Sequence, residues 1–250
     1  YKFMYLMLLV SAGLIGLSLG LLGAGGSILT VPALTLFLGL DEKSAITSSM
    51  IIIGMIAAVG SIRAYRNGAL DKRIITSFGI VSLPFAALGA RLGIWMPPGS
   101  QTVLLVAIMA VVALKMLADK PPVPGKSPSS WALLSAAATV GLITGVVGVG
   151  GGFLIVPALV IFAGANMQSA VSNSLLLIVI NSATAFASIA LSEQSPELNW
   201  LIILTMTGVG AASVLAGQSI SSRLDQHKLK RGFSILIVVV AIWLLANLFY

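Results

Sequence analysis

Two glycine-rich segments are the residues of this chain most able to do chemistry. Residues 20–34 read GLLGAGGSILTVPAL, and residues 145–159 read GVVGVGGGFLIVPAL. Glycine is costly inside a helix and proline breaks one, so a segment that only had to sit in a bilayer would need neither. A glycine-rich break that leads into a helix presents free N–H groups and the positive end of the helix dipole, which suit an anion. The candidate substrate-binding residues in these breaks are Gly25, Gly26, Ser27, Gly150, Gly151 and Gly152.

Polar side chains recur shortly after each glycine-rich segment. The stretch TSSM begins at Thr47, and the stretch SNSL begins at Ser172. A hydroxyl on an apolar helix often bonds only the preceding turn, and for Thr47 and Ser172 both roles stay open. The positions that follow them are polar in both copies, which favours a binding role. The candidate side-chain donors to the substrate are Ser48, Ser49, Asn173 and Ser174.

Three further polar residues fall within or near apolar runs. Asn181 has no polar twin, since its counterpart is Ile56, and we expect it to make a helix–helix hydrogen bond. Arg91 and Lys115 lie near the ends of apolar runs, where long basic side chains reach the membrane interface. Attraction of anions is the alternative role for Arg91.

The residues for catalysis or metal binding are missing from the sequence. The chain has no cysteine, and its one histidine, His227, lies in a basic loop. No Ser-His pair, metal cluster or acid dyad can be assembled from this pattern. The acidic residues all fall at expected loops or helix ends, which leaves no carboxylate for a proton relay in the membrane. The sequence therefore predicts a protein that is not an enzyme, with no cofactor and no metal site.

The composition indicates whether these elements fold in water or in a lipid bilayer. Hydrophobic residues make up 58% of the 250 residues, and charged residues only 8%. Soluble domains carry about 25% charged residues, so this chain is predicted to be an all-α polytopic membrane protein. The net charge of +7 comes from basic residues in short loops, where they set membrane orientation. The expected partners are the lipid bilayer and a small anionic substrate, with no nucleic acid. The sequence leaves the oligomeric state open, with a homodimer as one option.

The apolar runs divide the chain into two halves. A polar, proline-rich linker separates five runs from five more. The runs are 3–22, 28–40, 45–62, 74–96 and 102–117, then 131–147, 153–163, 170–191, 198–221 and 229–249. We interpret the first as a membrane helix rather than a signal peptide. The predicted domains are a first transmembrane repeat (1–117), a cytoplasmic linker (118–130) and a second, inverted transmembrane repeat (131–250).

The two halves repeat each other at the positions with special backbone roles. At an offset of 125 residues Pro32 falls on Pro157, and beyond the third run the offset becomes 128, so that Gly89 falls on Gly217. Gly16, Gly20, Gly23, Gly25 and Gly26 fall on Gly141, Gly145, Gly148, Gly150 and Gly151. Glycines at GxxxG spacing outside the dense clusters are expected to serve close helix packing.

Loop charges predict that the second half is inverted. The loop 63–73 after the third run holds four basic residues, and its counterpart 192–198 holds none. After the fourth run the pattern is reversed, with basic residues in 223–231. Basic short loops stay in the cytoplasm, which places both termini outside. The second runs are short. The 13 residues of 28–40 make about 20 Å of helix against a hydrocarbon core of about 30 Å, and 153–163 is shorter still, so each is expected to begin below the membrane surface. Broken or short helices at matching places in two inverted halves indicate a transport site.

The repeated motifs resemble those of a known family. The stretches GxGGSxLTVPAL and GxGGGFLIVPAL, followed by SAITSSM and SAVSNSL, are similar to the TauE/SafE family of sulfite exporters, also called the 4-toluene sulfonate uptake permease family. The resemblance covers nearly the whole chain. It implies a multi-pass transporter in the cytoplasmic (inner) membrane of a prokaryote, with sulfite, sulfonates or similar sulfur-containing anions as substrates.

The function predicted is secondary transport of such an anion by alternating access, in the export direction. Two alternatives stay open. One is a passive anion channel, and the other is a non-transporting membrane assembly or scaffold subunit. The scaffold alternative predicts no wet polar cavity at the glycine breaks.

Overall fold

The computed structural model describes residues 2–23, 25–97, 99–118, 130–148, 152–192, 196 and 198–248. Within these ranges every regular element is a helix, which confirms the all-α class. The first half contains α1 (Lys2–Leu22), α2 (Gly25–Pro32), the π-helical turn η1 (Ala33–Phe37), α3 (Glu42–Arg66), α4 (Lys72–Trp95) and α5 (Ser100–Ala118). The second half contains α6 (Ser130–Val147), α7 (Gly152–Phe162), α8 (Met167–Ala190), α9 (Trp200–Ser221) and α10 (Gln226–Leu248).

The helices are those of a polytopic membrane protein. Within the part of the chain that the structure describes, α3, α4, α8 and α9 are long and apolar enough to cross a bilayer, and the other apolar helical stretches are shorter. Large apolar side chains such as Ile80, Leu204 and Ile242 are exposed on the outside of the bundle. Such a surface suits lipid tails rather than water.

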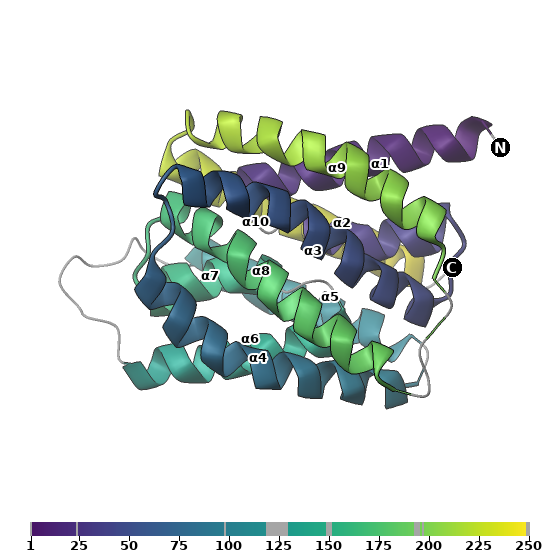
Figure 1. Ribbon diagram of the computed structural model, residues 1–250, viewed down its shortest axis with the longest axis horizontal. Coiled ribbons are helices and arrows are strands. Elements are labelled where there is room, and N and C mark those ends of the chain that lie inside the picture. The colour runs from purple at the N-terminus through teal and green to yellow at the C-terminus, as the bar shows by residue number, and fades with distance from the viewer. Residues whose placement is uncertain are drawn as a thin grey trace.

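The second helix of each half is short, as the sequence predicts. Helix α2 has 8 residues and α7 has 11. Figure 1 shows α1 entering from one end of the bundle and α2 turning back toward that end, whereas α6 and α7 form the same kind of hairpin from the opposite end. The glycine-rich segments lie at the two hairpin tips, where the chain reverses.

Equivalent residues of the two halves make equivalent local structure. Asp41 caps α3 by accepting from the Ser44 N–H at 3.0 Å, and Asn166 caps α8 by accepting from the Ser169 N–H at 2.8 Å. Each pair matches the other at the offset of 125 residues. An oxygen at this position satisfies an N–H that has no partner within the helix. The bond from the Ser44 N–H also lowers the pKa of Asp41 below its ordinary value, because it stabilises the carboxylate.

The two halves are interlocked through their first and fourth helices. Helix α1 packs along α9, and the equivalent α6 packs along α4. A Cβ built at Gly16 would lie 2.2 Å from Gly210 O, and one built at Gly145 would lie 2.1 Å from Ala86 O. These glycines therefore let two helix backbones touch, which confirms the packing role expected for the GxxxG positions.

Basic residues collect at one end of the bundle. Figure 1 shows the start of α1 and the end of α10 at one end, and the turns after α3 and α9 at the other. The second end carries Arg66 and Lys72 near the first turn and Arg223 near the second. Its placement in the cytoplasm follows from the rule that basic short loops stay inside, and it stays a prediction.

Cysteine labelling tests this orientation directly, because the native chain has no cysteine. Single cysteines at Asn67 and Ser222 are expected to react with a membrane-impermeant maleimide only from the cytoplasmic side. A cysteine at Ser192 is expected to react only from outside. Labelling of Asn67 and Ser192 from the same side would contradict the inverted arrangement.

Candidate functional site

Two buried serines donate hydrogen bonds to the glycine breaks, the glycine-rich turns that precede α2 and α7, and each serine comes from the opposite half of the chain. The Ser174 hydroxyl on α8 donates to Gly23 O at 2.9 Å, and the Ser49 hydroxyl on α3 donates to Gly148 O at 2.5 Å. Both serines are 0% exposed. Each half thus supplies the serine that holds the break of the other half. Both hydroxyls also bond their own helix, so their contacts in this structure are to the protein backbone.

The breaks themselves need glycine. Gly23 and Gly148 both have φ of 69°, in the left-handed region that other residues rarely adopt. A Cβ at Gly23 would lie 2.7 Å from Val171 Cα, and one at Gly148 would lie 2.0 Å from Ile46 Cγ2. Each break is therefore a tight helix end that contacts the third helix of the other half.

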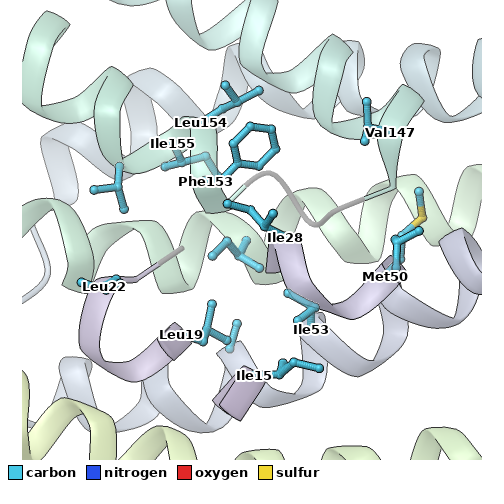
Figure 2. Close-up of a cluster of buried hydrophobic side chains, with 14 of the residues drawn as sticks. Ile15, Leu19, Leu22, Ile28, Met50, Ile53, Val147, Phe153, Leu154 and Ile155 are labelled. Atoms are coloured by element: carbon cyan, nitrogen blue, oxygen red, sulfur yellow. The ribbon is translucent and has the colours of Figure 1, made fainter. Parts of the chain in front are cut away.

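The starts of α2 and α7 meet in the interior. Ile28 of α2 and Phe153 of α7 are fully buried and lie beside each other above Leu19 (Figure 2). The first N–H groups of a helix have no partner within it and carry the positive end of its dipole. No carboxylate is buried among the described residues. The two helix ends therefore give this region a positive bias.

The glycine-segment candidates occupy several environments. Gly26 packs on the hairpin partner, because a Cβ there would lie 2.1 Å from Ile15 O. Ser27 is fully buried, and Gly25 and Gly152 begin α2 and α7. Gly150 and Gly151 lie outside the described residues.

Two side-chain candidates lie near these breaks on α3 and α8. The Asn173 amide donates to Ser169 O at 2.8 Å, and its oxygen accepts from the Asp71 N–H at 2.7 Å. Ser48 is 1% exposed, and no hydrogen bond of its hydroxyl is found among the described residues. Ser48 is thus the serine candidate whose hydroxyl is still available as a donor.

A polar cavity opens at the end of the bundle where α3 and α9 finish. We call it the open vestibule; it has a volume of about 250 Å³. It reaches Gly20 and Val171, which flank the first glycine break. Its lining residues are Gly20, Arg63, Ala64, Asn67, Ala69, Gln168, Val171, Ser172, Gln218, Ser221 and Ser222.

An equivalent cavity at the opposite end is nearly closed. We call it the closed vestibule; it has a volume of about 30 Å³. Its wall matches that of the open vestibule at the repeat offsets. Lys43, Ile46, Thr47 and Gly145 stand where Gln168, Val171, Ser172 and Gly20 stand in the open one.

Lys43 makes hydrogen bonds across the closed vestibule. Its ammonium donates to Gly93 O, to Met96 O at 3.1 Å and to the Gln101 side-chain oxygen at 2.8 Å. Gln101 in turn donates to Val146 O, next to the second glycine break. Gly93 O and Met96 O lie at the C-terminal end of α4, where the carbonyls carry the negative end of the helix dipole, so a cation binds there well.

At the open end the corresponding contact is stretched. The Gln168 amide reaches Leu224 O at 3.5 Å, the position equivalent to the contact of Lys43 with Met96 O. The closed end has a further tie, because the Glu42 carboxylate accepts from the Gly99 N–H at 2.6 Å and from the Thr102 hydroxyl at 2.7 Å. The two ends of the molecule thus differ in cavity volume and in the contacts that cross the cavity.

Comparison with known proteins identifies the family. Residues 8–244 match the family described as "Sulfite exporter TauE/SafE". The chain belongs to the TauE/SafE family. It is 31% identical over 255 residues to a "Probable membrane transporter protein" of Xylella fastidiosa (strain Temecula1), covering 94% of this chain and 92% of the relative. A protein of the same description from Haemophilus influenzae is 26% identical, with 97% and 98% of the two chains covered. No solved structure matches the chain.

This TauE/SafE protein is therefore a membrane transporter, and the structure adds residues that sequence reasoning missed. Lys43, Gln101 and Arg63 were not predicted as functional. The repeat alignment carried one signal, since it pairs Lys43 with Gln168 at an otherwise similar position. The helix–helix role expected for Asn181 is confirmed, because its oxygen accepts from the hydroxyl of Ser82 on α4 at 2.9 Å.

Proposed function

We propose that this protein exports a small sulfur-containing anion, such as sulfite or a sulfonate, across the cytoplasmic membrane of a prokaryote by alternating access. The observation that carries the proposal is the pair of equivalent vestibules at opposite ends, with volumes of about 250 and about 30 Å³. The sulfur chemistry of the substrate is drawn from the family's description as sulfite exporters.

Alternating access fits this asymmetry because the two ends are built from equivalent residues. The closed-end contact of Lys43 with Met96 O measures 3.1 Å, and its open-end counterpart from Gln168 measures 3.5 Å. A transition that breaks the first contact and tightens the second would exchange the states of the two vestibules. A passive channel would have both ends open at once while it conducts. A scaffold subunit would have no need for a polar cavity beside the first break.

The substrate site proposed lies at the two hairpin tips. Backbone N–H groups of Gly25, Gly26 and Ser27 and of Gly150–Gly152 would hold the oxyanion. Ser48, Ser49, Asn173 and Ser174 would contribute side-chain donors. In this structure the Ser49 and Ser174 hydroxyls donate to glycine carbonyls and the Asn173 amide donates to Ser169 O, so these three would exchange those partners for the anion. Support comes from the positive helix ends and the lack of a buried carboxylate among the described residues.

The orientation proposed gives the transporter a loading side. If the basic end lies in the cytoplasm, the open vestibule faces the cytoplasm and is the one from which an exported anion would be taken up. Both termini then lie outside.

Flux into liposomes from purified protein tests this function. We expect saturable uptake of sulfite or methanesulfonate, accelerated by unlabelled substrate on the far side, as carriers show. Gly151→Val is expected to abolish flux, because a side chain would fill the space the oxyanion needs. Non-saturating chloride flux without acceleration would indicate a channel, and no flux of any sulfur anion would contradict the proposal. Near-normal flux with Gly151→Val would contradict the proposal that the glycine segments bind the oxyanion.

A further inference from the structure

The open vestibule carries a cation that no acidic side chain neutralises. Arg63 lies half-buried in its wall, and its guanidinium donates to Leu215 O at 2.6 Å. Within the described residues the one ion pair joins Lys228 and Asp225, neither of which lines the cavity. A guanidinium has five N–H donors, so most of those of Arg63 stay available to a ligand.

The remaining polar wall supplies neutral donors. The Asn67 amide and the Ser172 hydroxyl line the cavity and make no side-chain hydrogen bond among the described residues. The Gln218 and Gln168 amides and the Ser222 hydroxyl also line it, but they already donate to Gly60 O, Leu224 O and Ser219 O. No carboxylate is among the lining residues that the structure describes. A guanidinium beside two neutral donors and no carboxylate favours an anion, because a cationic ligand would meet repulsion and no charged partner.

Each end of the molecule has an arginine, Arg63 on α3 at one end and Arg91 on α4 at the other, and the two positions are not equivalent in the repeat. The counterpart of Arg63 in the second half is Ser188, whose hydroxyl donates to Ala87 O at 3.1 Å, just as Arg63 bonds the equivalent Leu215 O. At that end Arg91 on α4 donates to the Ser188 hydroxyl at 3.2 Å, and the cation that lines the cavity is Lys43. The backbone contact is therefore made with or without a cation. The bond to this carbonyl therefore does not by itself require a cation at residue 63.

We propose that the open vestibule is an anion-binding site in which Arg63 holds a small oxyanion before it reaches the first glycine break. The cavity of about 250 Å³ accommodates such an ion together with water. Its inner wall includes Gly20 and Val171, and the latter touches the break at Gly23. The site deepens the transport function proposed above, and it rests on that function for the identity of the bound ion as substrate.

Calorimetry on the purified protein tests the site without requiring transport. The probes are sulfite, methanesulfonate, sulfate and chloride. Arg63→Gln is expected to weaken binding of the preferred oxyanion about 10- to 100-fold, the effect of losing charge-assisted hydrogen bonds. Arg63→Lys keeps the charge and is expected to lose less. Arg66→Gln is the matched control, since it removes the same charge one turn along from an exposed position outside the cavity wall. That variant is expected to change binding less than twofold.

The outcomes separate this site from the transport function. Equal weakening by Arg63→Gln and Arg66→Gln would mean that only the general surface charge acts, and it would overturn the site. Unchanged binding with Arg63→Gln, or no binding of any probe by the native protein, would overturn it as well. Arg63-dependent binding without liposome flux would support the anion site and contradict the proposed transport function. Thermal unfolding of each variant checks that loss of the bond to Leu215 O has not unfolded the protein, and Arg63→Lys decides the case if Arg63→Gln does unfold.

Discussion

Gly16→Ala is expected to destabilise the protein strongly, whereas Gly13→Ala on the same helix is expected to leave it unchanged or slightly more stable. A Cβ at Gly16 would lie 2.2 Å from Gly210 O, and the atoms in the way belong to the α9 backbone, which cannot rotate aside. Overpacking of this kind costs about 1–3 kcal/mol or more, against a gain of about 1 kcal/mol from replacing a helical glycine by alanine.

The control variant isolates the packing effect. A Cβ at Gly13 would meet only the Ser213 hydroxyl oxygen, at an ordinary contact distance of 3.8 Å. The two variants therefore share the gain in helix propensity and differ in the clash. The measurement is thermal unfolding in detergent, with the fraction of monodisperse protein after heating as a second readout. Equal stability of the two variants would mean that α1 and α9 do not touch as described.

Lys43→Met is expected to open the closed vestibule and to slow transport by alternating access. Methionine fills a similar volume but donates no hydrogen bond, so the contacts to Gly93 O, Met96 O and Gln101 are lost. A hydrogen bond from a charged group contributes about 1.5–3 kcal/mol, which corresponds to a shift in the equilibrium between closed and open states of about tenfold or more.

Single cysteines at equivalent positions report this shift. A cysteine at Thr47 probes the closed vestibule, and one at Ser172 probes the open vestibule. In the native background the cysteine at Ser172 is expected to react readily and the one at Thr47 slowly. Lys43→Met should accelerate the reaction at Thr47 about tenfold and slow it at Ser172.

Loss of a lysine charge at the other end of the bundle is the control. Lys72→Met removes the same charge from an exposed site at the other end of the bundle and is expected to change neither rate. Acceleration at Thr47 without slowing at Ser172 would favour a channel in which both ends open independently. Unchanged labelling at Thr47 would mean that Glu42 and the surrounding packing, rather than Lys43, keep this end closed.

The glycine breaks could be predicted from the sequence because their cause is local. A left-handed φ at Gly23 and Gly148 and a helix end before each short second helix follow from the residue type and its immediate neighbours. The helix caps at Asp41 and Asn166 are local in the same sense, since the side chain bonds a group three residues away. Each of these features occurs at equivalent positions in both halves, which strengthens the prediction.

The role of the serines could be predicted only in part. The recurrence of Ser49 and Ser174 marked them as functional, but recurrence cannot say which atom a hydroxyl meets. Their partners, Gly148 O and Gly23 O, lie in the opposite half of the chain. That contact exists only because the two halves are interlocked.

The sequence by itself determined the membrane class, the duplication, the short second helices and the places where the chain must break, since all of these depend on composition and on neighbouring residues. The tertiary structure decided which vestibule is open and which side chains matter in it. Lys43 and Arg63 stand near helix ends, where a basic residue commonly does no more than reach the membrane interface. The function proposed for them arises from carbonyls and amides that lie 50 or more residues away along the chain, at Gly93, Met96 and Leu215. Such partners are brought together by packing, and no pattern within one segment specifies them.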